Sequence, residues 1–110
     1  MIVLPTNWPK GAETSAEHIA IARAAENGVF VATCDRVGKE NGFEFIGLSK
    51  IIDPSGHVLA AAGAGEETIW ADVDLAAARN KRVVNIPGKY EIDVMACRRP
   101  ELYGALQDRQ

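Results

Sequence analysis

An alanine-rich helical segment that stops directly before an apolar run constrains this fold more than any other feature. Thr14 or Ser15 offers an N-cap, and strong helix formers continue to Asn27. The pair Asn27-Gly28 predicts the end of the helix, because glycine readily adopts the left-handed backbone that closes helices. Residues 29–34 follow at once and are almost all apolar, which predicts a strand buried on both faces.

A further strand is expected before the helix. Ile2 to Leu4 is an apolar, β-branched run that predicts a short buried strand ended by Pro5. Two prolines and a glycine then mark residues 5–11 as a loop. Because the sequence opens inside a strand, without a polar lead-in, we expect more sequence upstream of Met1.

The middle of the chain predicts an antiparallel meander. Residues 35–42 form a polar loop in this interpretation, and residues 43–52 form one strand. Small Gly47 and Ser49 among large neighbours indicate close approach of another backbone or a ligand.

A tight turn and two more strands complete the predicted meander. Asp53-Pro54-Ser55-Gly56 has the composition of a tight turn, so residues 57–61 are the expected return strand of a hairpin. Residues 66–73 then predict a third antiparallel strand. The succession of strand, helix, strand and meander is that of a mixed α/β layer.

The C-terminal part carries weaker signals. Asp74 is expected to cap a helix that runs to about Arg82, with Leu75 and Ala78 facing inward. Two further features are a turn at Pro87-Gly88 and a short helix from Pro100 through Leu106.

Composition excludes several classes of function. The 110 residues allow one domain at most, and the net charge of -3 lacks the clustered Lys and Arg of a nucleic-acid-binding protein. No apolar run approaches the roughly 20 residues of a membrane span, and the N-terminus has no signal-peptide pattern. We therefore expect a cytoplasmic protein whose two cysteines, Cys34 and Cys97, are reduced thiols.

Five short motifs in order resemble one family over nearly the whole chain. They are Leu4-Pro5-Thr6-Asn7-Trp8-Pro9, Arg23-Ala24-Ala25-Glu26-Asn27, Asp35-Arg36-Val37-Gly38, Phe45-Ile46-Gly47-Leu48-Ser49 with Asp53-Pro54-Ser55-Gly56, and Arg99-Pro100-Glu101-Leu102-Tyr103. This pattern resembles the nitrilase superfamily of carbon–nitrogen hydrolases. One departure is Asp35, which stands where the family's loop has Asn.

The resemblance implies a fold and a reaction. The family's fold is a four-layer α-β-β-α sandwich longer than this chain, so residues 1–110 would be the C-terminal portion of one such domain. The implied reaction is hydrolysis of non-peptide C–N bonds in small amides, carbamoyl compounds or nitriles. The family's Cys nucleophile, Glu base and Lys lie upstream of the Pro-Thr-Asn-Trp-Pro loop, so we expect no catalytic residue in this chain and no activity from it alone.

Asn7 and Trp8 are the residues we expect to contact substrate. They follow the carboxyl end of a strand, where ligands bind in α/β sheets. In the family this loop lies by the active-site pocket. The alternative is structural: Asn7 caps the loop backbone and Trp8 packs in the core.

The remaining residues whose side chains could take part in catalysis or binding are interpreted as structural. Cys34 precedes an arginine, which could activate a thiol, but a small buried thiol at a strand end is the favoured interpretation. His18 and His57 are expected at the surface and are too few for a metal site, so we expect neither a metal nor a cofactor. Trp70 is expected to pack against the fold or an interface.

Two functions remain open from the sequence. The first is part of a carbon–nitrogen hydrolase, with an amide or nitrile substrate and a homo-oligomeric assembly. The second is a freestanding, non-catalytic homologue that acts as an assembly or interaction module through residues 98–106. A complete small enzyme that uses Cys34 is the third and weakest interpretation.

Overall fold

The protein is described from a computed structural model, which describes residues 1–104. The chain divides into two compact units, Met1–Asn80 and a second unit from Lys81 onward. Within the described residues, no helix is both long and apolar enough to cross a membrane.

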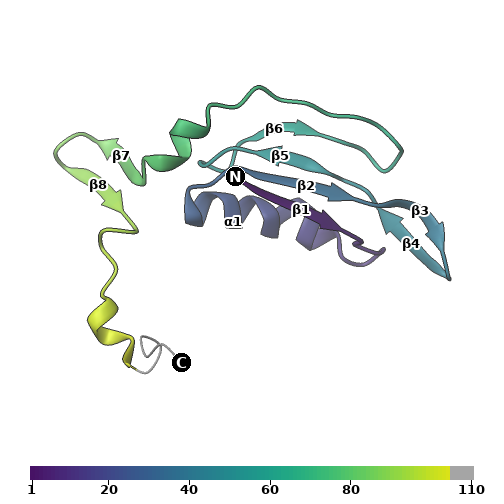
Figure 1. Ribbon diagram of the computed structural model, residues 1–110, viewed down its shortest axis with the longest axis horizontal. Coiled ribbons are helices and arrows are strands. Elements are labelled where there is room, and N and C mark those ends of the chain that lie inside the picture. The colour runs from purple at the N-terminus through teal and green to yellow at the C-terminus, as the bar shows by residue number, and fades with distance from the viewer. Residues whose placement is uncertain (105–110) are drawn as a thin grey trace. The chain divides into compact units, whose positions relative to one another are not determined.

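The first unit is a four-stranded mixed sheet with a helix packed on it (Figure 1). The strand order is β1-β2-β5-β6; β1 runs parallel to β2, and the other two pairings are antiparallel. The helical segment connects β1 to β2, as the parallel pairing requires. The bounds are β1 Ile2–Thr6, β2 Val31–Asp35, β5 Lys50–Ile52 and β6 Val58–Ala61. The predicted mixed α/β arrangement with antiparallel strands is confirmed.

The helical segment comprises η1 (Ser15–Ile19), a π-helical stretch, and α1 (Ala20–Asn27). Gly28 ends it with a φ of 57°, and its N–H donates to the last carbonyls, so the predicted stop is confirmed. The predicted N-cap is wrong: Thr14 already has helical backbone angles and makes no capping bond through its side chain.

Alanines let the helix lie close to the sheet. Ala20 and Ala24 are buried and pack with Val31 of β2 and Ile52 of β5. Trp8 is half-buried against the same cluster. The fully buried helical contacts come from alanine methyl groups, and Ile21 packs half-buried against the same cluster.

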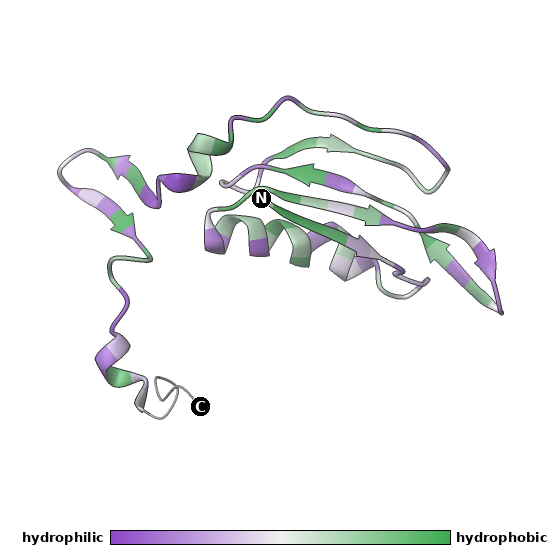
Figure 2. Cartoon of the chain, in the orientation of Figure 1, coloured by the Kyte–Doolittle hydropathy of each residue, from purple (hydrophilic) through white to green (hydrophobic). Residues whose placement is uncertain are grey.

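Two predictions of burial are wrong. β1 was expected to be buried, yet Val3 is 64% exposed and β1 is the edge of the sheet. Figure 2 colours the first residues of this strand as hydrophobic. In β2 the alternate residues Val31 and Thr33 are buried, whereas Cys34 is exposed, so the strand is not buried on both faces. Within the described chain, α1 covers one face of the sheet.

The predicted polar loop at 35–42 is wrong as well. Residues Val37–Glu40 form β3, which pairs with β4 (Phe43–Ile46) in an antiparallel hairpin. The two residues between them, Asn41 and Gly42, have φ values of 50° and 84°. Asn-Gly is the sequence preferred for such two-residue turns, because both positions need a positive φ.

The predicted continuous strand 43–52 is broken between β4 and β5. Gly47 and Leu48 have φ values of 66° and 60°, which no strand accommodates. The predicted close approach is confirmed at Gly47, where an added Cβ would lie 2.8 Å from the Gly63 carbonyl oxygen.

The turn at residues 53–56 is confirmed. The Gly56 N–H donates to the Asp53 carbonyl at 3.0 Å, and β6 follows within one residue of its predicted start. The predicted third antiparallel strand at 66–73 is wrong, because this segment joins no sheet. Trp70 lies in it and is 80% exposed, so it does not pack against the described chain.

Asp74 caps a helix as predicted, and its side chain accepts a hydrogen bond from the Ala76 N–H. The helix η2 is a 3-10 helix over Leu75–Arg79 and ends before the predicted Arg82. Leu75 is 54% exposed, so the expectation that it faces inward is wrong.

The second unit contains a hairpin of β7 (Arg82–Ile86) and β8 (Tyr90–Asp93). The predicted Pro87-Gly88 turn lies between the strands, which themselves were not predicted. The 3-10 helix η3 (Pro100–Leu102) begins at the predicted proline, and the predicted helix end at Leu106 lies outside the described residues.

Candidate functional site

The loop that carries Asn7 and Trp8 is held at the carboxyl ends of both parallel strands. The Trp8 N–H donates to Oδ1 of Asp35 at 2.7 Å, and the Trp8 carbonyl accepts from the Ile46 N–H at 3.1 Å. The Arg36 N–H donates to the Thr6 carbonyl at 3.2 Å. The backbone of this loop is therefore held by residues at the ends of β2 and β4 and by Arg36, which follows β2.

Asn7 and Trp8 occupy different environments. Asn7 is exposed, whereas Trp8 is half-buried and contacts the apolar cluster between the helix and the sheet. Trp8 also lines a cavity of about 350 Å³ together with Ile2, Leu4 and Ile19. This packing agrees with the structural alternative for Trp8, and a role of either residue in binding substrate stays a prediction.

Asp35 makes hydrogen bonds to two segments around the loop of Asn7 and Trp8, and the sequence analysis did not assign it a role. The residue is 8% exposed; its N–H donates to Oγ of Ser49 at 2.8 Å, and its Oδ1 accepts from the Trp8 N–H. Its other carboxylate oxygen, Oδ2, is buried and has no hydrogen-bond partner among the described residues. The signal that could have identified it was the acidic residue at the end of an apolar strand.

Lys50 links the sheet to the start of the helix. Its ammonium donates to the carbonyls of Ala16 and Leu48 at 2.9 and 3.3 Å. Its backbone N–H donates to Oγ1 of Thr33 at 2.8 Å. These bonds satisfy buried or half-buried polar groups, so Lys50 has a structural role in the described chain.

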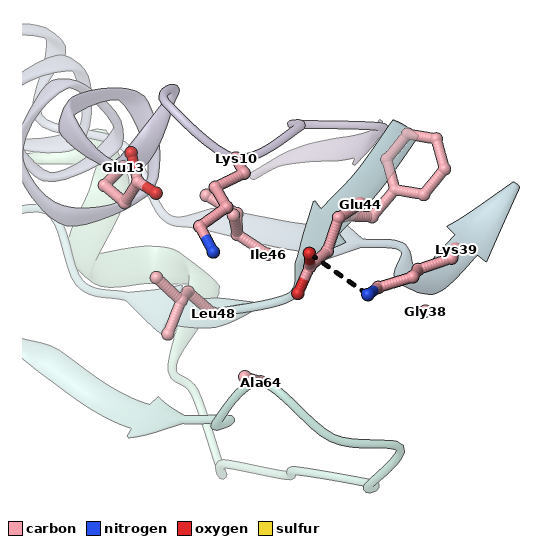
Figure 3. Close-up of a pocket in the computed structure, with 9 residues that line it drawn as sticks. Lys10, Glu13, Gly38, Lys39, Glu44, Ile46, Leu48 and Ala64 are labelled. Atoms are coloured by element: carbon pink, nitrogen blue, oxygen red, sulfur yellow. Dashed lines mark ion pairs between the residues drawn. The ribbon is translucent and has the colours of Figure 1, made fainter. Parts of the chain in front are cut away.

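A cleft of about 370 Å³ opens beside the same loop (Figure 3). Two lysines, two glutamates and an apolar wall surround it. Its lining comprises Lys10, Glu13, Gly38, Lys39, Glu44, Phe45, Ile46, Leu48 and Ala64.

The charges of the cleft are partly fixed by local contacts. Lys39 and Glu44 form an ion pair at 3.5 Å across the hairpin. The Gly11 N–H donates to the Glu13 carboxylate at 3.1 Å and lowers the pKa of that carboxyl. The Lys10 N–H donates to the Glu44 carbonyl at 2.8 Å, which anchors the Lys10 backbone at the rim.

Cys34 is exposed, which contradicts the expected buried thiol. It lines a cavity of about 220 Å³ with Ser49, Glu66 and Glu67. Hydrolysis by a thiol needs a base and also a cation or dipole for the developing charge. The described residues around this cavity include carboxylates but no lysine, arginine or histidine. Cys34 therefore has no complete catalytic set within the described chain.

The two histidines lie at the surface, as predicted. His18 is exposed on the helical segment, and Nδ1 of His57 lies 3.1 Å from Oδ2 of Asp53 in the hairpin turn. The described residues contain no group of three or more side chains arranged to hold a metal ion. Arg23 and Glu26 form an ion pair at 2.7 Å on the helix, but both side chains are exposed and the pair adds little stability.

Comparison with known proteins gives a match over most of the chain. A family model described as carbon-nitrogen hydrolase matches residues 4–83. A nitrilase of Pyrococcus abyssi is 43% identical over 82 residues, which cover 74% of this chain and 29% of the nitrilase. A 2-oxoglutaramate amidase of Bacillus subtilis is 40% identical over 75 residues, or 68% of this chain and 29% of the amidase. The chain thus spans less than a third of the length of these curated relatives.

A solved structure agrees with these relatives. A CN-hydrolase superfamily protein of Xanthomonas campestris, crystallised with an arsenic adduct in its active site, matches with a TM-score of 0.63 and 28% identity. The match covers 72% of this chain and 31% of that protein.

Proposed function

Because the chain belongs to the carbon–nitrogen hydrolase family, we propose that it is the C-terminal portion of a hydrolase domain acting on non-peptide C–N bonds. The match over residues 4–83 carries this proposal. The complete domain would be a four-layer α-β-β-α sandwich. The exposed apolar edge of β1 supports this, since an apolar edge strand normally requires a covering partner.

The proposed substrate is a small linear amide, and a nitrile is the alternative. The relatives include an amidase of 2-oxoglutaramate and a nitrilase, and these two chemistries share an attack on an electrophilic carbon bonded to nitrogen. For an amide, a thiolate adds to the carbonyl carbon, the C–N bond breaks, and the nitrogen leaves as ammonia after it takes up a proton. Water then hydrolyses the thioester and releases the acid and the thiol.

The catalytic Cys, Glu and Lys of the reaction are proposed to come from the part of the relatives' length that this chain does not span. The described residues that line the cavity beside Cys34 include no lysine, arginine or histidine, which supports that assignment. This chain would contribute one wall of the pocket through Asn7 and Trp8, whose loop is held by Asp35.

The assembled enzyme is proposed to be a cytoplasmic homo-oligomer. Apolar side chains of the β7–β8 hairpin support an assembly, because Val83, Ile86 and Tyr90 are each about half exposed in the described chain. Two-stranded hairpins of this kind are marginal in water unless something packs on them.

Complementation tests the proposed function. The chain is co-expressed with the part of the Pyrococcus abyssi nitrilase that lies N-terminal to the matched 82 residues, and release of ammonia from simple amides is measured. We expect hydrolysis from the mixture and none from either part alone. Turnover by the purified chain that disappears in Cys34→Ser would instead make this chain a complete enzyme. A stable complex without turnover would favour the non-catalytic assembly module.

A further inference from the structure

The cleft in Figure 3 lies where a ligand of an α/β sheet is expected. Lys10 belongs to the loop after β1, and Gly38 and Lys39 belong to β3, which follows β2 directly. Because β1 and β2 are parallel, their carboxyl ends meet at one edge of the sheet. Ligands of open α/β sheets bind outside the carboxyl ends of the strands.

We propose that this cleft binds the charged end of an amino acid that carries a side-chain amide, with Lys10 contacting its carboxylate and Glu13 its ammonium group. The inference rests on the proposed amide hydrolysis and specifies the substrate class. The side-chain amide would extend away from the charged end towards the catalytic groups of the complete domain.

The balance of charge favours a zwitterion. Lys10 and Lys39 oppose Glu13 and Glu44, so the walls of the cleft carry no net charge. Lys39 and Glu44 already pair with each other, whereas the ion pairs of the described residues do not include Lys10. In Figure 3 the Lys10 side chain extends from its loop into the cleft. A ligand with one negative and one positive group can pair with Lys10 and Glu13, and the net charge of the site then stays at zero.

The apolar wall fits the methylene groups of such a ligand. Ile46 and Leu48 line the cleft and are half-buried, as is Phe45. Leu48 adopts a φ of 60°, a conformation that is unusual for a residue with a bulky side chain. Such backbone is retained where the surrounding structure enforces it, and it clusters at ligand sites. The volume of about 370 Å³ is in the range of small-molecule pockets.

Titration of the isotopically labelled chain with three ligands tests the proposal by NMR. The ligands are L-glutamine, the monoamide of glutaric acid, which lacks the ammonium group, and butyramide, which is neutral. We expect glutamine to shift the amide signals of Lys10 and Leu48. We expect it to bind about fivefold more tightly than the monoamide, the gain of roughly one ion pair, and more tightly still than butyramide, which lacks both charged groups. Equal binding of butyramide and glutamine would overturn the proposal.

Variants of two exposed lysines show whether binding depends on the charge of Lys10 or only on the net charge of the chain. Lys10→Gln removes the ammonium group, and we expect it to weaken glutamine binding about fivefold, whereas Lys10→Arg retains binding. Lys89→Gln, in the β7–β8 turn, makes the same change away from the cleft and should have no effect. Unchanged affinity in Lys10→Gln, with a native-like spectrum, would contradict the proposal.

The same ligands in the complemented enzyme distinguish this proposal from the proposed function. Turnover of butyramide without any preference for glutamine would overturn the zwitterion site and leave the hydrolase assignment intact. Glutamine binding to the cleft, together with a complemented mixture that hydrolyses no amide, would support the site and count against the hydrolase.

Discussion

The Asp35 carboxylate accepts a hydrogen bond from the backbone N–H of Trp8, with 2.7 Å between Oδ1 and the nitrogen. The bond joins the loop after β1 to the end of β2, residues that are 27 positions apart in sequence. The second oxygen of the same carboxylate, Oδ2, is buried without a partner among the described residues. One side chain therefore both fixes the candidate substrate loop and retains an unused hydrogen-bond acceptor.

Asp35→Ala is expected to lower the free energy of unfolding by about 1–3 kcal/mol, because it leaves the Trp8 N–H without its acceptor. Asp35→Asn keeps Oδ1 and replaces the unpaired Oδ2 by an amide, so its cost should stay below that of the alanine variant. Urea unfolding measures both. In a Trp70→Phe background, Trp8 fluorescence should be more accessible to acrylamide in Asp35→Ala. Unchanged stability in Asp35→Ala would show that the Trp8 bond contributes nothing.

Gly47→Ala is expected to destabilise the chain more than the same change at Gly42. Both glycines have a positive φ, so each alanine suffers backbone strain. At Gly47 the new Cβ also meets the Gly63 carbonyl oxygen at 2.8 Å, whereas nothing lies within 4 Å at Gly42. We expect a loss of about 1 kcal/mol at Gly42 and about 2–4 kcal/mol at Gly47, measured by thermal or urea unfolding. Similar losses at both sites would argue against the close approach.

Most of the confirmed predictions come from signals that act within a few residues, although the N-cap at Thr14 and the turn at Asn41-Gly42 show that such signals also failed. Gly28 ends the helix and Asp74 caps η2, as expected, because each depends on backbone groups that are near in sequence. The turn at residues 53–56 was predicted for the same reason. The close approach at Gly47 joins distant residues, and its signal was a small residue among large neighbours. The family resemblance, drawn from short ordered motifs, is also confirmed.

Burial and the strand pairings beyond the β5–β6 hairpin could not be predicted, because they depend on which layers are present. Cys34 is exposed although it lies in an apolar run, since α1 covers one face of the sheet. The residues 66–73 alternate like a strand but have no partner strand. At the candidate site, Asn7 and Trp8 were chosen from the sequence, whereas Asp35 and Lys10 gain their significance from contacts with distant segments.

Asp53→Asn should flatten the dependence of stability on pH in acid. Burial raises the pKa of Asp53, but hydrogen bonds from the backbone N–H groups of His57 and Ser55 outweigh it and lower the pKa below its ordinary value. A carboxyl with a lowered pKa stabilises the fold above its unfolded pKa, near 4, and loses this contribution as pH falls through the folded pKa. Unfolding at pH 5, 4 and 3 measures the effect. We expect the parent to lose more stability than the variant below pH 4. If the free energy of unfolding fell equally with pH in both proteins, Asp53 would not contribute to the acid dependence of stability.

Val3→Thr tests whether β1 is an edge that pairs with the rest of the domain. Val3 is 64% exposed in this chain, so the change should alter the stability of the chain alone by less than about 0.5 kcal/mol. Burial of the new hydroxyl on association should cost about 1–3 kcal/mol and weaken binding to the complementing nitrilase segment about fivefold or more. Val58→Thr makes the same change on β6, the opposite edge, and serves as the matched control. Calorimetric titration measures the affinity of both variants for the nitrilase segment. An equal loss of affinity in the two variants would show that β1 is not the strand at which the two parts associate.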